Sequence, residues 1–393
     1  MPPEFLPLEG VRVVDVTSSL AGPYCTEILG ALGADVVKVE HPERGDEART
    51  WGPPFRDDDS ALFYAANLNK RSLALDIKRG RSVLLRLVDG ADVFLQSLRP
   101  GTAKRLGYGP NELRGRNPRL VYCDIGAFGR VGPLRDRAGY DPLLQAFGGL
   151  VSVTGEPGRP GVRVGASVVD QGTGVWAALA IVAALHAGGG RTIEVSLFET
   201  VVALMPYQVA GYLATGEVPG RHGTAFPLIA PYQVFRVRDG ELMIAAANDG
   251  LFRRLCAALD APELADDARF ATNPDRLARR EELAALLEEQ LADFRLEDVH
   301  ARLTDAGVPA APVNDVRAVA EHEQTAALGL IQRLPEPAVA FPLSFDGERV
   351  VQRTPPPSLG EHSADVLREL GYDDEEIDGL AAQRIIRAVE SEA

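Results

Sequence analysis

The sequence predicts an α/β protein with a doubly wound parallel sheet in a large domain and a second, smaller domain. Two observations lead to this fold class. Apolar, β-branched runs over 11–17 and 34–40 flank a helical pattern over 23–33, as in a parallel βαβ unit. The alternation then continues with a helical pattern over 79–90 and strand patterns over 91–98 and 118–128.

The pattern changes at about residue 228. Two strand patterns, 230–237 and 240–247, are joined by Arg238, Asp239 and Gly240, which is a hairpin signal. Helical patterns over 251–260 and 279–294 follow, so we expect a smaller domain of strands and helices here. A proline-rich segment, a strand pattern over 343–351 and a loop leading into a terminal helix over 354–371 complete the chain.

Composition and charge exclude several classes of protein. The chain has 393 residues, of which 46% are hydrophobic and 25% charged, and no apolar run reaches the ~20 residues that span a bilayer. The formal net charge of −15 argues against nucleic acid or a membrane surface as a partner. The N-terminal residues lack a signal-peptide pattern and the three cysteines lack a pairing or metal spacing, so we expect a cytoplasmic protein without a metal.

The turn after the first predicted strand argues against a nicotinamide site. Glu40 ends the βαβ unit where a ribose-binding acid would stand, but residues 17–25 read TSSLAGPYC, with one glycine where GxGxxG has three. GxSxG, HExxH, paired CxxC and P-loop motifs are absent, and the six histidines are scattered. Serine hydrolysis and metal-dependent hydrolysis therefore lack support.

Asp170 is the strongest catalytic candidate that the residues themselves offer. It stands between a short apolar run over 165–169 and a helical pattern that continues to 187. We expect a strand-to-helix turn, where free helix N–H groups and the helix dipole keep the carboxylate ionised. Such a group is either a nucleophile, with Gly172 and Gly174 admitting a close ligand, or a simple helix cap. Position alone leaves both open.

Cationic residues cluster near three predicted strand ends. They are Lys70 with Arg71, Arg99, and Lys104 with Arg105. Open α/β sheets bind ligands at strand ends, so together these side chains could grip phosphates. The alternative for each is an ordinary solvated surface residue.

Several segments, in order, resemble the class III CoA-transferase family, also called CaiB/BaiF, along essentially the whole chain. They read LEGVRVVDVTSSLAGPYCTEILGALGADVVKVEHPERGDEAR, NLNKRSLALD, LRPGTAKRLGYG, GYDPLLQAFGGL, GASVVDQGTG, APYQVFRVRDG and GVPAAPVNDV. The resemblance implies a Rossmann-like large domain over 1–205 and 330–393, a small domain over 228–320, and linkers over 206–227 and 321–329. It also implies an interlocked, ring-like homodimer.

The resemblance implies roles for individual residues. Asp170 would be the nucleophile that forms a mixed anhydride with the donor acyl group and then a thioester with CoA. Contacts to coenzyme A, the co-substrate, would come from Ser19, Leu20, Ala21, His41, Asn67, Lys70, Ser97, Arg99 and Arg105. Tyr140 and Asp141 would lie at the acyl end, and Gly220 and Gly223 in a mobile loop. Leu20 replaces a glutamine of the formate and oxalate enzymes, which argues against those substrates.

Two other functions fit parts of the sequence. An α-methylacyl-CoA racemase of the same fold carries a histidine where Tyr140 stands, so its second base would be missing here. A non-catalytic CoA-ester binding protein would keep the cations and have no need of Asp170. The acceptor would be a carboxylic acid; Arg137 and Arg163 could face a dicarboxylate such as succinate, or lie on the surface.

Overall fold

The computed structural model describes residues 5–56, 58–334 and 336–388, and the chain separates into two compact units. Unit 1 comprises Met1–Leu150, Val164–Ala214 and Gln324–Ala393, and unit 2 comprises Val151–Arg163 and Thr215–Glu323. Residues 151–163, which we assigned to the large domain, make their contacts within unit 2. Residues 206–214, which we assigned to a linker, belong to unit 1.

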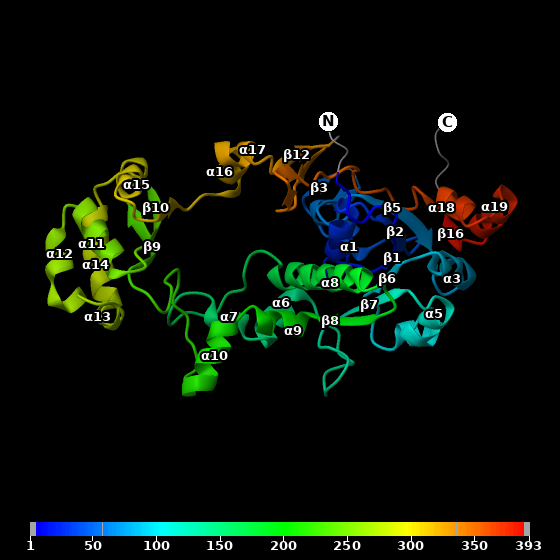
Figure 1. The fold of residues 1–393 in the computed structure, drawn as a ribbon, viewed down its shortest axis with the longest axis horizontal. Helices are drawn as coiled ribbons and strands as arrows, with labels where there is room; N and C mark the ends of the chain where they lie inside the picture. The colour runs from blue at the N-terminus through cyan, green and yellow to red at the C-terminus, as the bar shows by residue number, and fades with distance from the viewer. Residues whose placement is uncertain (1–4, 57, 335, 389–393) are drawn as a thin grey trace. The chain divides into compact units, whose positions relative to one another are not determined.

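Unit 1 is built on one seven-stranded sheet with the order β16-β5-β2-β1-β6-β7-β8 (Figure 1). Every neighbouring pair is parallel except β16 with β5. The predicted α/β fold with a parallel sheet is therefore confirmed. The strands are β1 (Arg12–Val16), β2 (Asp35–Glu40), β5 (Lys70–Leu75), β6 (Val93–Gln96), β7 (Val121–Gly126), β8 (Thr192–Ser196) and β16 (Ile386–Arg387).

Helices cover both faces of this sheet because both faces are apolar. On β1, Val13 belongs to the core under α1 (Ala21–Ala31) and α8 (Val168–His186), whereas Val14 belongs to the core on the opposite face. Successive strand side chains point to opposite faces, so each strand contributes to both cores. The second core is covered by α3 (Arg81–Asp89), α5 (Pro110–Arg116), α18 (Ser363–Glu369) and α19 (Asp374–Ala382).

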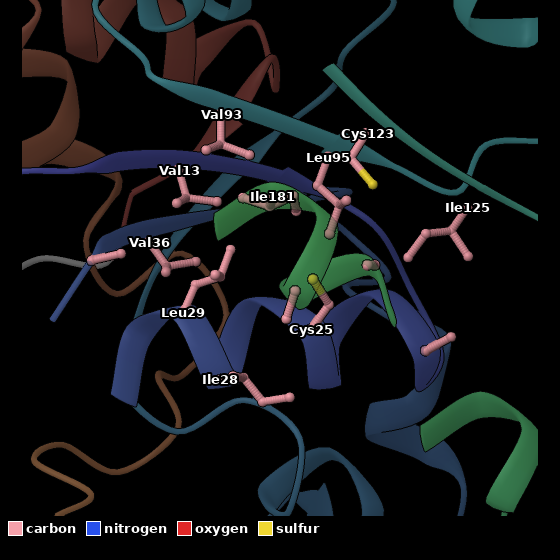
Figure 2. Packing of buried hydrophobic residues seen from close by; sticks show 14 of the residues in the cluster. Val13, Cys25, Ile28, Leu29, Val36, Val93, Leu95, Cys123, Ile125 and Ile181 are labelled. Atoms are coloured by element: carbon pink, nitrogen blue, oxygen red, sulfur yellow. The ribbon is translucent and has the colours of Figure 1, made fainter. Parts of the chain in front are cut away.

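The first core joins α1 and α8 to the sheet. Figure 2 shows Cys25 and Leu29 of α1, Ile181 of α8 and the strand residues Val13 and Leu95 gathered in it. α8 passes close to α1, since a Cβ on Gly174 would lie 2.7 Å from the carbonyl oxygen of Ala21. A glycine is therefore required at this crossing. The position of α8 is set by α1 and the sheet.

α8 is also long and apolar enough to cross a bilayer by length and composition, as is the bent pair α9 (Leu197–Ala203) and α10 (Pro206–Thr215) taken together. Among the described helices, these are the candidates. α8 contributes Val169, Ala177 and Ile181 to the core it shares with α1. Core helices of globular domains meet the same length and hydropathy criteria.

Unit 2 has its own core. The expected hairpin is confirmed as β9 (Tyr232–Val237) and β10 (Gly240–Ala245), and β11 (Ala310–Pro312) pairs with β10. Phe235 and Leu242 of this sheet pack with the helices. The helices are α11 (Asp249–Ala258), α12 (Pro262–Asp266), α13 (Asn273–Ala278), α14 (Arg280–Leu291), α15 (Leu296–Asp305) and α16 (Val316–Glu321).

The C-terminal segment differs from its prediction in two places. The helix expected to be terminal, α18, is followed by α19 and β16. The strand expected over 343–351 is a tight hairpin of β14 (Ser344–Phe345) and β15 (Glu348–Arg349). Asp346 and Gly347 both have positive φ, 51° and 89°, which turns the chain back. The remaining elements are the 3-10 helices η1 (Glu47–Thr50) and η2 (Ala268–Phe270), β3 (Phe55–Arg56), β4 (Asp59–Ser60), α2 (Ala61–Tyr64), α4 (Thr102–Leu106), α6 (Asp141–Phe147), α7 (Leu150–Val153), α17 (Glu323–Ala327), β12 (Ile331–Arg333) and β13 (Pro337–Val339).

Candidate active site

A cavity of about 470 Å³ in unit 1 lies at the carboxyl ends of β1, β6 and β7. The strand order reverses between β1 and β6, and open α/β sheets bind ligands at such a reversal. The loops after these two strands meet there, because the amide of Ser18 donates to Oγ of Ser97 at 3.2 Å. Asp170 lines this cavity, so one predicted site residue stands at the reversal point.

Asp170 lies in the first turn of α8, not at a strand-to-helix turn. Residues 161–167 before the helix are irregular, so the expected strand is wrong. The amides of Val164 and Val169 donate to side chains of α6 instead of to a neighbouring strand, so the run does not pair into a sheet. The helix itself starts at Val168, so Asp170 projects from a rigid element.

The free helix N–H groups expected to stabilise the charge of Asp170 are not available to it. Burial, reinforced by the nearby carboxylate of Asp141, raises the pKa of Asp170 from 3.8 to about 7. The backbone N–H groups that should have stabilised its charge are already used, since those of Val169 and Asp170 donate to Asp141 at 2.9 and 3.2 Å. Asp170 therefore exchanges its proton near neutral pH.

Asp141 is buried and does not line the cavity. Besides the two backbone donors of α8, its carboxylate accepts a hydrogen bond from Nε2 of Gln145 at 2.6 Å. Asp141 was expected to contact the acyl group, but the structure places it outside the cavity. No spacing in the sequence links residue 141 with residues 169 and 170, which come together only through the packing of α6 on α8.

Four arginines line the cavity beside Asp170: Arg99, Arg130, Arg135 and Arg137. Arg130 is paired with Asp124 at the end of β7. Arg99 follows β6, and the other two lie in the loop after β7. Sequence reasoning singled out Arg99 and Arg137 but missed Arg130 and Arg135. The sequence signal that could have found Arg130 and Arg135 is their position just after a predicted strand, because the loop after a parallel strand lies at the ligand-binding edge of the sheet.

Tyr140 stands on the same wall and is half-exposed. Its hydroxyl lies 3.3 Å from Oε1 of Glu47, and its ring meets the edge of Trp51 at a centroid distance of 6.1 Å. Burial and the neighbouring Glu47 raise the pKa of Tyr140 above 10.0. The phenol therefore remains neutral at physiological pH, and its single O–H donates to Glu47.

The loop after β1 is held in place by the segment after β2. Ser19 has a φ of 71°, its amide donates to Oδ1 of Asp46 at 2.9 Å, and its hydroxyl donates to Glu47 at 2.6 Å. Leu20, the N-cap of α1, is buried, and Ala21 lines the cavity. Of these three predicted residues, Ser19 and Ala21 face the cavity.

A second cavity of about 370 Å³ adjoins the first. Ser18, Gly45, Ser97 and Leu98 line both. His41 and Lys78 line the second cavity at the ends of β2 and β5. The structure thus joins His41, Ser97, Arg99 and Asp170 along one continuous hollow.

Asn67 and Lys70 are buried and lie outside both cavities. Nζ of Lys70 donates to Oδ1 of Asn67 and the carbonyl of Pro23, both at 2.8 Å, and lies 3.4 Å from Asp15. Burial lowers the pKa of Lys70 to about 8, although the charge of Asp15 opposes the shift. These two side chains therefore hold α1 and β5 together, and neither lines the cavities beside Asp170 and His41.

Arg105 lines neither cavity, and the predicted glycine loop belongs to unit 2. Arg105 is exposed on α4, where its guanidinium donates to Oγ1 of Thr102 at 3.0 Å. Gly220, Gly223 and Arg163 belong to unit 2. The amide of Gly223 donates to the carbonyl of Gly155 at 2.9 Å within that unit. The mobility of this loop stays a prediction.

Metal ligation has no cluster to support it among the described residues. In that part of the chain, no three His, Cys, Asp or Glu side chains are grouped as metal ligands. The three cysteines, Cys25, Cys123 and Cys256, are free and buried.

A model of CoA-transferase family III matches residues 8–363. The chain belongs to this family. An acyl-CoA transferase of Fusarium pseudograminearum is 38% identical, covering 94% of this chain and 86% of its own length. A succinate–glutarate CoA-transferase of Agrobacterium fabrum is also 38% identical, over 94% of this chain and 97% of its own.

A solved structure agrees with the assignment. A CaiB/BaiF family protein from Brucella suis is 40% identical, with a TM-score of 0.85, over 93% of this chain and all of the other. The resemblance stated from the sequence is therefore confirmed, and the protein is an enzyme, a class III CoA-transferase. Sequence reasoning singled out Asp170 and Asp141 but missed the proton affinity of Asp170 and the buried contact of Asp141 with the start of α8.

Proposed function

We propose that this class III CoA-transferase moves CoA from an acyl-CoA donor to a carboxylic acid through covalent intermediates on Asp170. The observation that carries the proposal is the position of Asp170. It projects from a rigid helix into a cavity at the reversal point of the sheet, beside arginines that can hold anionic groups.

The chemistry needs the ionised form of Asp170. A carboxylate oxygen attacks the thioester carbonyl and the C–S bond breaks, which gives an aspartyl mixed anhydride and CoA thiolate. The thiolate attacks the aspartyl carbonyl, and the donor acid leaves. The acceptor carboxylate then attacks this aspartyl thioester, and the released thiolate attacks the acceptor's carbonyl in the new anhydride. Acyl-CoA is formed and Asp170 is regenerated.

CoA would extend along the two adjoining cavities. Ser97 lies where the two cavities meet, and the loop of Ser19, Leu20 and Ala21 lies beside the first cavity. His41 lines the second cavity. Arg99 offers a guanidinium to phosphate. Because Asn67 and Lys70 are buried beneath this surface, they support the loops without touching CoA. Arg105, exposed on α4, remains a proposed phosphate contact.

The acyl group would carry a second carboxylate. Arg99 and Arg137 bring positive charge to the wall of the cavity that Asp170 lines, whereas Arg130 and Arg135 are paired with Asp124 and Asp136. The Agrobacterium relative is named for two dicarboxylates, succinate and glutarate, and its similarity supports the same class here. Arg137 is the residue we expect to contact the distal carboxylate.

A CoA-exchange assay tests the proposal. Succinyl-CoA is supplied with a panel of mono- and dicarboxylates, and new CoA esters are followed by mass spectrometry. We expect exchange with dicarboxylates, a CoA adduct on the peptide containing Asp170, and no exchange by Asp170→Asn, while calorimetry shows retained CoA binding. Incorporation of solvent deuterium at Cα without an acceptor acid would indicate a racemase, and full activity of Asp170→Asn would exclude the nucleophile.

A further inference from the structure

We propose that Asp141 is a positioning residue for Asp170. The carboxylate of Asp141 fixes the first turn of α8 and holds a negative charge beside the nucleophile. The inference rests on the proposed function of Asp170. It assigns to Asp141 a role that acts through its neighbour, because Asp141 itself does not line the cavity.

The contact is a helix cap supplied from another helix. Asp141 is 2% exposed, and Oδ2 accepts from the amides of Val169 and Asp170 at 2.9 and 3.2 Å. Ser167 is the N-cap residue of α8, and its side chain makes no capping hydrogen bond. The start of α8 therefore depends on α6 for the partners that a helix terminus requires.

Gln145, one turn further along α6, completes the clamp. Its Nε2 donates to Oδ1 of Asp141 at 2.6 Å, and its Oε1 accepts from the amide of Val164 at 2.8 Å. Gln145 is fully buried. Two side chains of α6 thus grip both ends of the segment 164–170, and the backbone that carries Asp170 is fixed at each end.

The same contact brings two acids together. Asp141 is the charged group whose proximity adds to burial in raising the pKa of Asp170 to about 7. A more basic carboxylate is a stronger nucleophile, and a value near neutrality leaves a large fraction ionised. Other titratable or charged groups on the surrounding elements are Glu47, Arg99, Arg130, Arg135, Arg137 and Tyr140 on the cavity wall, Tyr24, Cys25 and Glu27 on α1, Tyr122, Cys123 and Asp124 on β7, Glu194 on β8 and Glu199 on α9.

The pH profile of the full-length enzyme separates this role from simple packing. Asp141→Asn removes the charge and keeps an oxygen acceptor, so the acid limb of kcat/KM should move about one pH unit or more to lower pH. Glu199→Gln is the matched control, since it removes an exposed carboxylate from a helix that also packs on α8. The control should leave the limb in place. An unmoved limb in Asp141→Asn overturns the inference.

A second readout does not need activity. Protein labelled with 13C at the aspartate Cγ is titrated by NMR, with the signal of Asp170 assigned from its loss in Asp170→Asn. We expect a midpoint near pH 7 in the wild type and a lower one in Asp141→Asn or, if that variant does not fold, in Asp141→Ser, which keeps an oxygen acceptor. A wild-type midpoint near pH 4 overturns the inference. Failure of CoA exchange with this titration intact would instead count against the proposed function.

Discussion

The Asp170 carboxyl group couples catalysis to stability, because its pKa of about 7 in the fold exceeds the unfolded value of 3.8. The folded state then holds the proton more tightly, so the stability this group contributes is complete below about pH 4 and is lost as the pH rises to about 7. Asp170→Asn removes the charge. We expect its free energy of unfolding at pH 8 to exceed the wild-type value by roughly 2–4 kcal/mol.

Chemical denaturation at pH 8 and pH 5 measures this difference. The gain should be smaller at pH 5, where the wild-type Asp170 is largely protonated in the folded state. A variant that is less stable than the wild type at pH 8 would show that the carboxylate of Asp170 is not destabilising. A variant that gains stability and loses activity is expected when a functional group is itself destabilising to the fold.

Lys70 shows which part of residue-level prediction failed. The sequence presents Lys70 and Arg71 as one cationic pair, but neighbours on a strand point to opposite faces. Lys70 points under α1 to Asp15, whereas Arg71 pairs with Asp35 and Glu369. Charge patterns in a sequence do not distinguish a buried ion pair from a phosphate contact, since both need a cation near a strand end.

The sequence around Asp15 does not indicate which residues pair with its carboxylate. Burial pushes its pKa up, but the charges of Lys70 and Lys38 and the hydroxyls of Thr17 and Thr26 outweigh burial and hold that pKa below 3.8. A buried carboxylate must be paired and hydrogen-bonded in this way. The pairing joins β1, β2, β5 and α1, and only the folded topology shows it.

At the scale of elements, the crossing of α1 and α8 positions Asp170. A Cβ on Gly174 would lie 2.7 Å from the carbonyl oxygen of Ala21 and 3.2 Å from the amide of Cys25. Gly174→Ala must push α8 away from α1, which we expect to cost about 1–3 kcal/mol of stability. Asp170 lies one turn earlier on α8, so kcat should fall roughly tenfold or more. Denaturation and the exchange assay measure the two effects.

Gly379→Ala on α19 is the control for this substitution. Gly379 is also helical, but a Cβ there meets no atom within 4 Å. Alanine should therefore stabilise the protein by roughly 0.5–1 kcal/mol and leave kcat unchanged. Equal effects of the two substitutions would mean that helix propensity, rather than the close crossing, governs position 174.

Strands and helices with clear periodicity were predictable, and boundaries set by long-range contacts were not. The βαβ unit over 11–40 and the hairpin at Asp239 and Gly240 were confirmed, because β-branched runs and turn residues are local signals. The apolar run before Asp170 reads as a strand, yet it forms a loop. Its backbone is held by Asp141 and Gln145, which lie more than 15 residues away.

At the scale of the whole molecule, the strand order explains where the site lies. The chain runs outward from β1 to β2 and β5, then returns to β6 on the other side of β1. The loops after β1 and β6 touch through Ser18 and Ser97, but the helices that follow them cover opposite faces of the sheet, so a hollow is left at the strand ends. The α/β alternation predicted such a reversal. The arginines that enter the hollow from the loop after β7 required the structure.

Unit 1 also exposes large apolar side chains on α8 and α6. On α8, Trp176 and Leu179 are 50% and 57% exposed, and on α6 Leu143 and Phe147 are 58% and 56% exposed. Large apolar side chains left exposed on two helices that pack together are typical of an interaction site. A second copy of the chain is the partner that we propose, as the resemblance to an interlocked homodimer implied.

Leu179→Glu tests the proposed dimer. In a two-fold symmetric contact the same substitution occurs twice, so two charges are placed against apolar surface. Interlocked chains cannot separate once folded, so the substitution acts by disfavouring their association during folding. We expect light scattering to give a dimer for the wild type and a monomer for Leu179→Glu at micromolar concentration. Ala382→Glu, which adds the same charge to an exposed position of α19, should remain dimeric. A wild-type protein that is monomeric at these concentrations would refute the assignment, and the apolar face of α8 would then need a different partner.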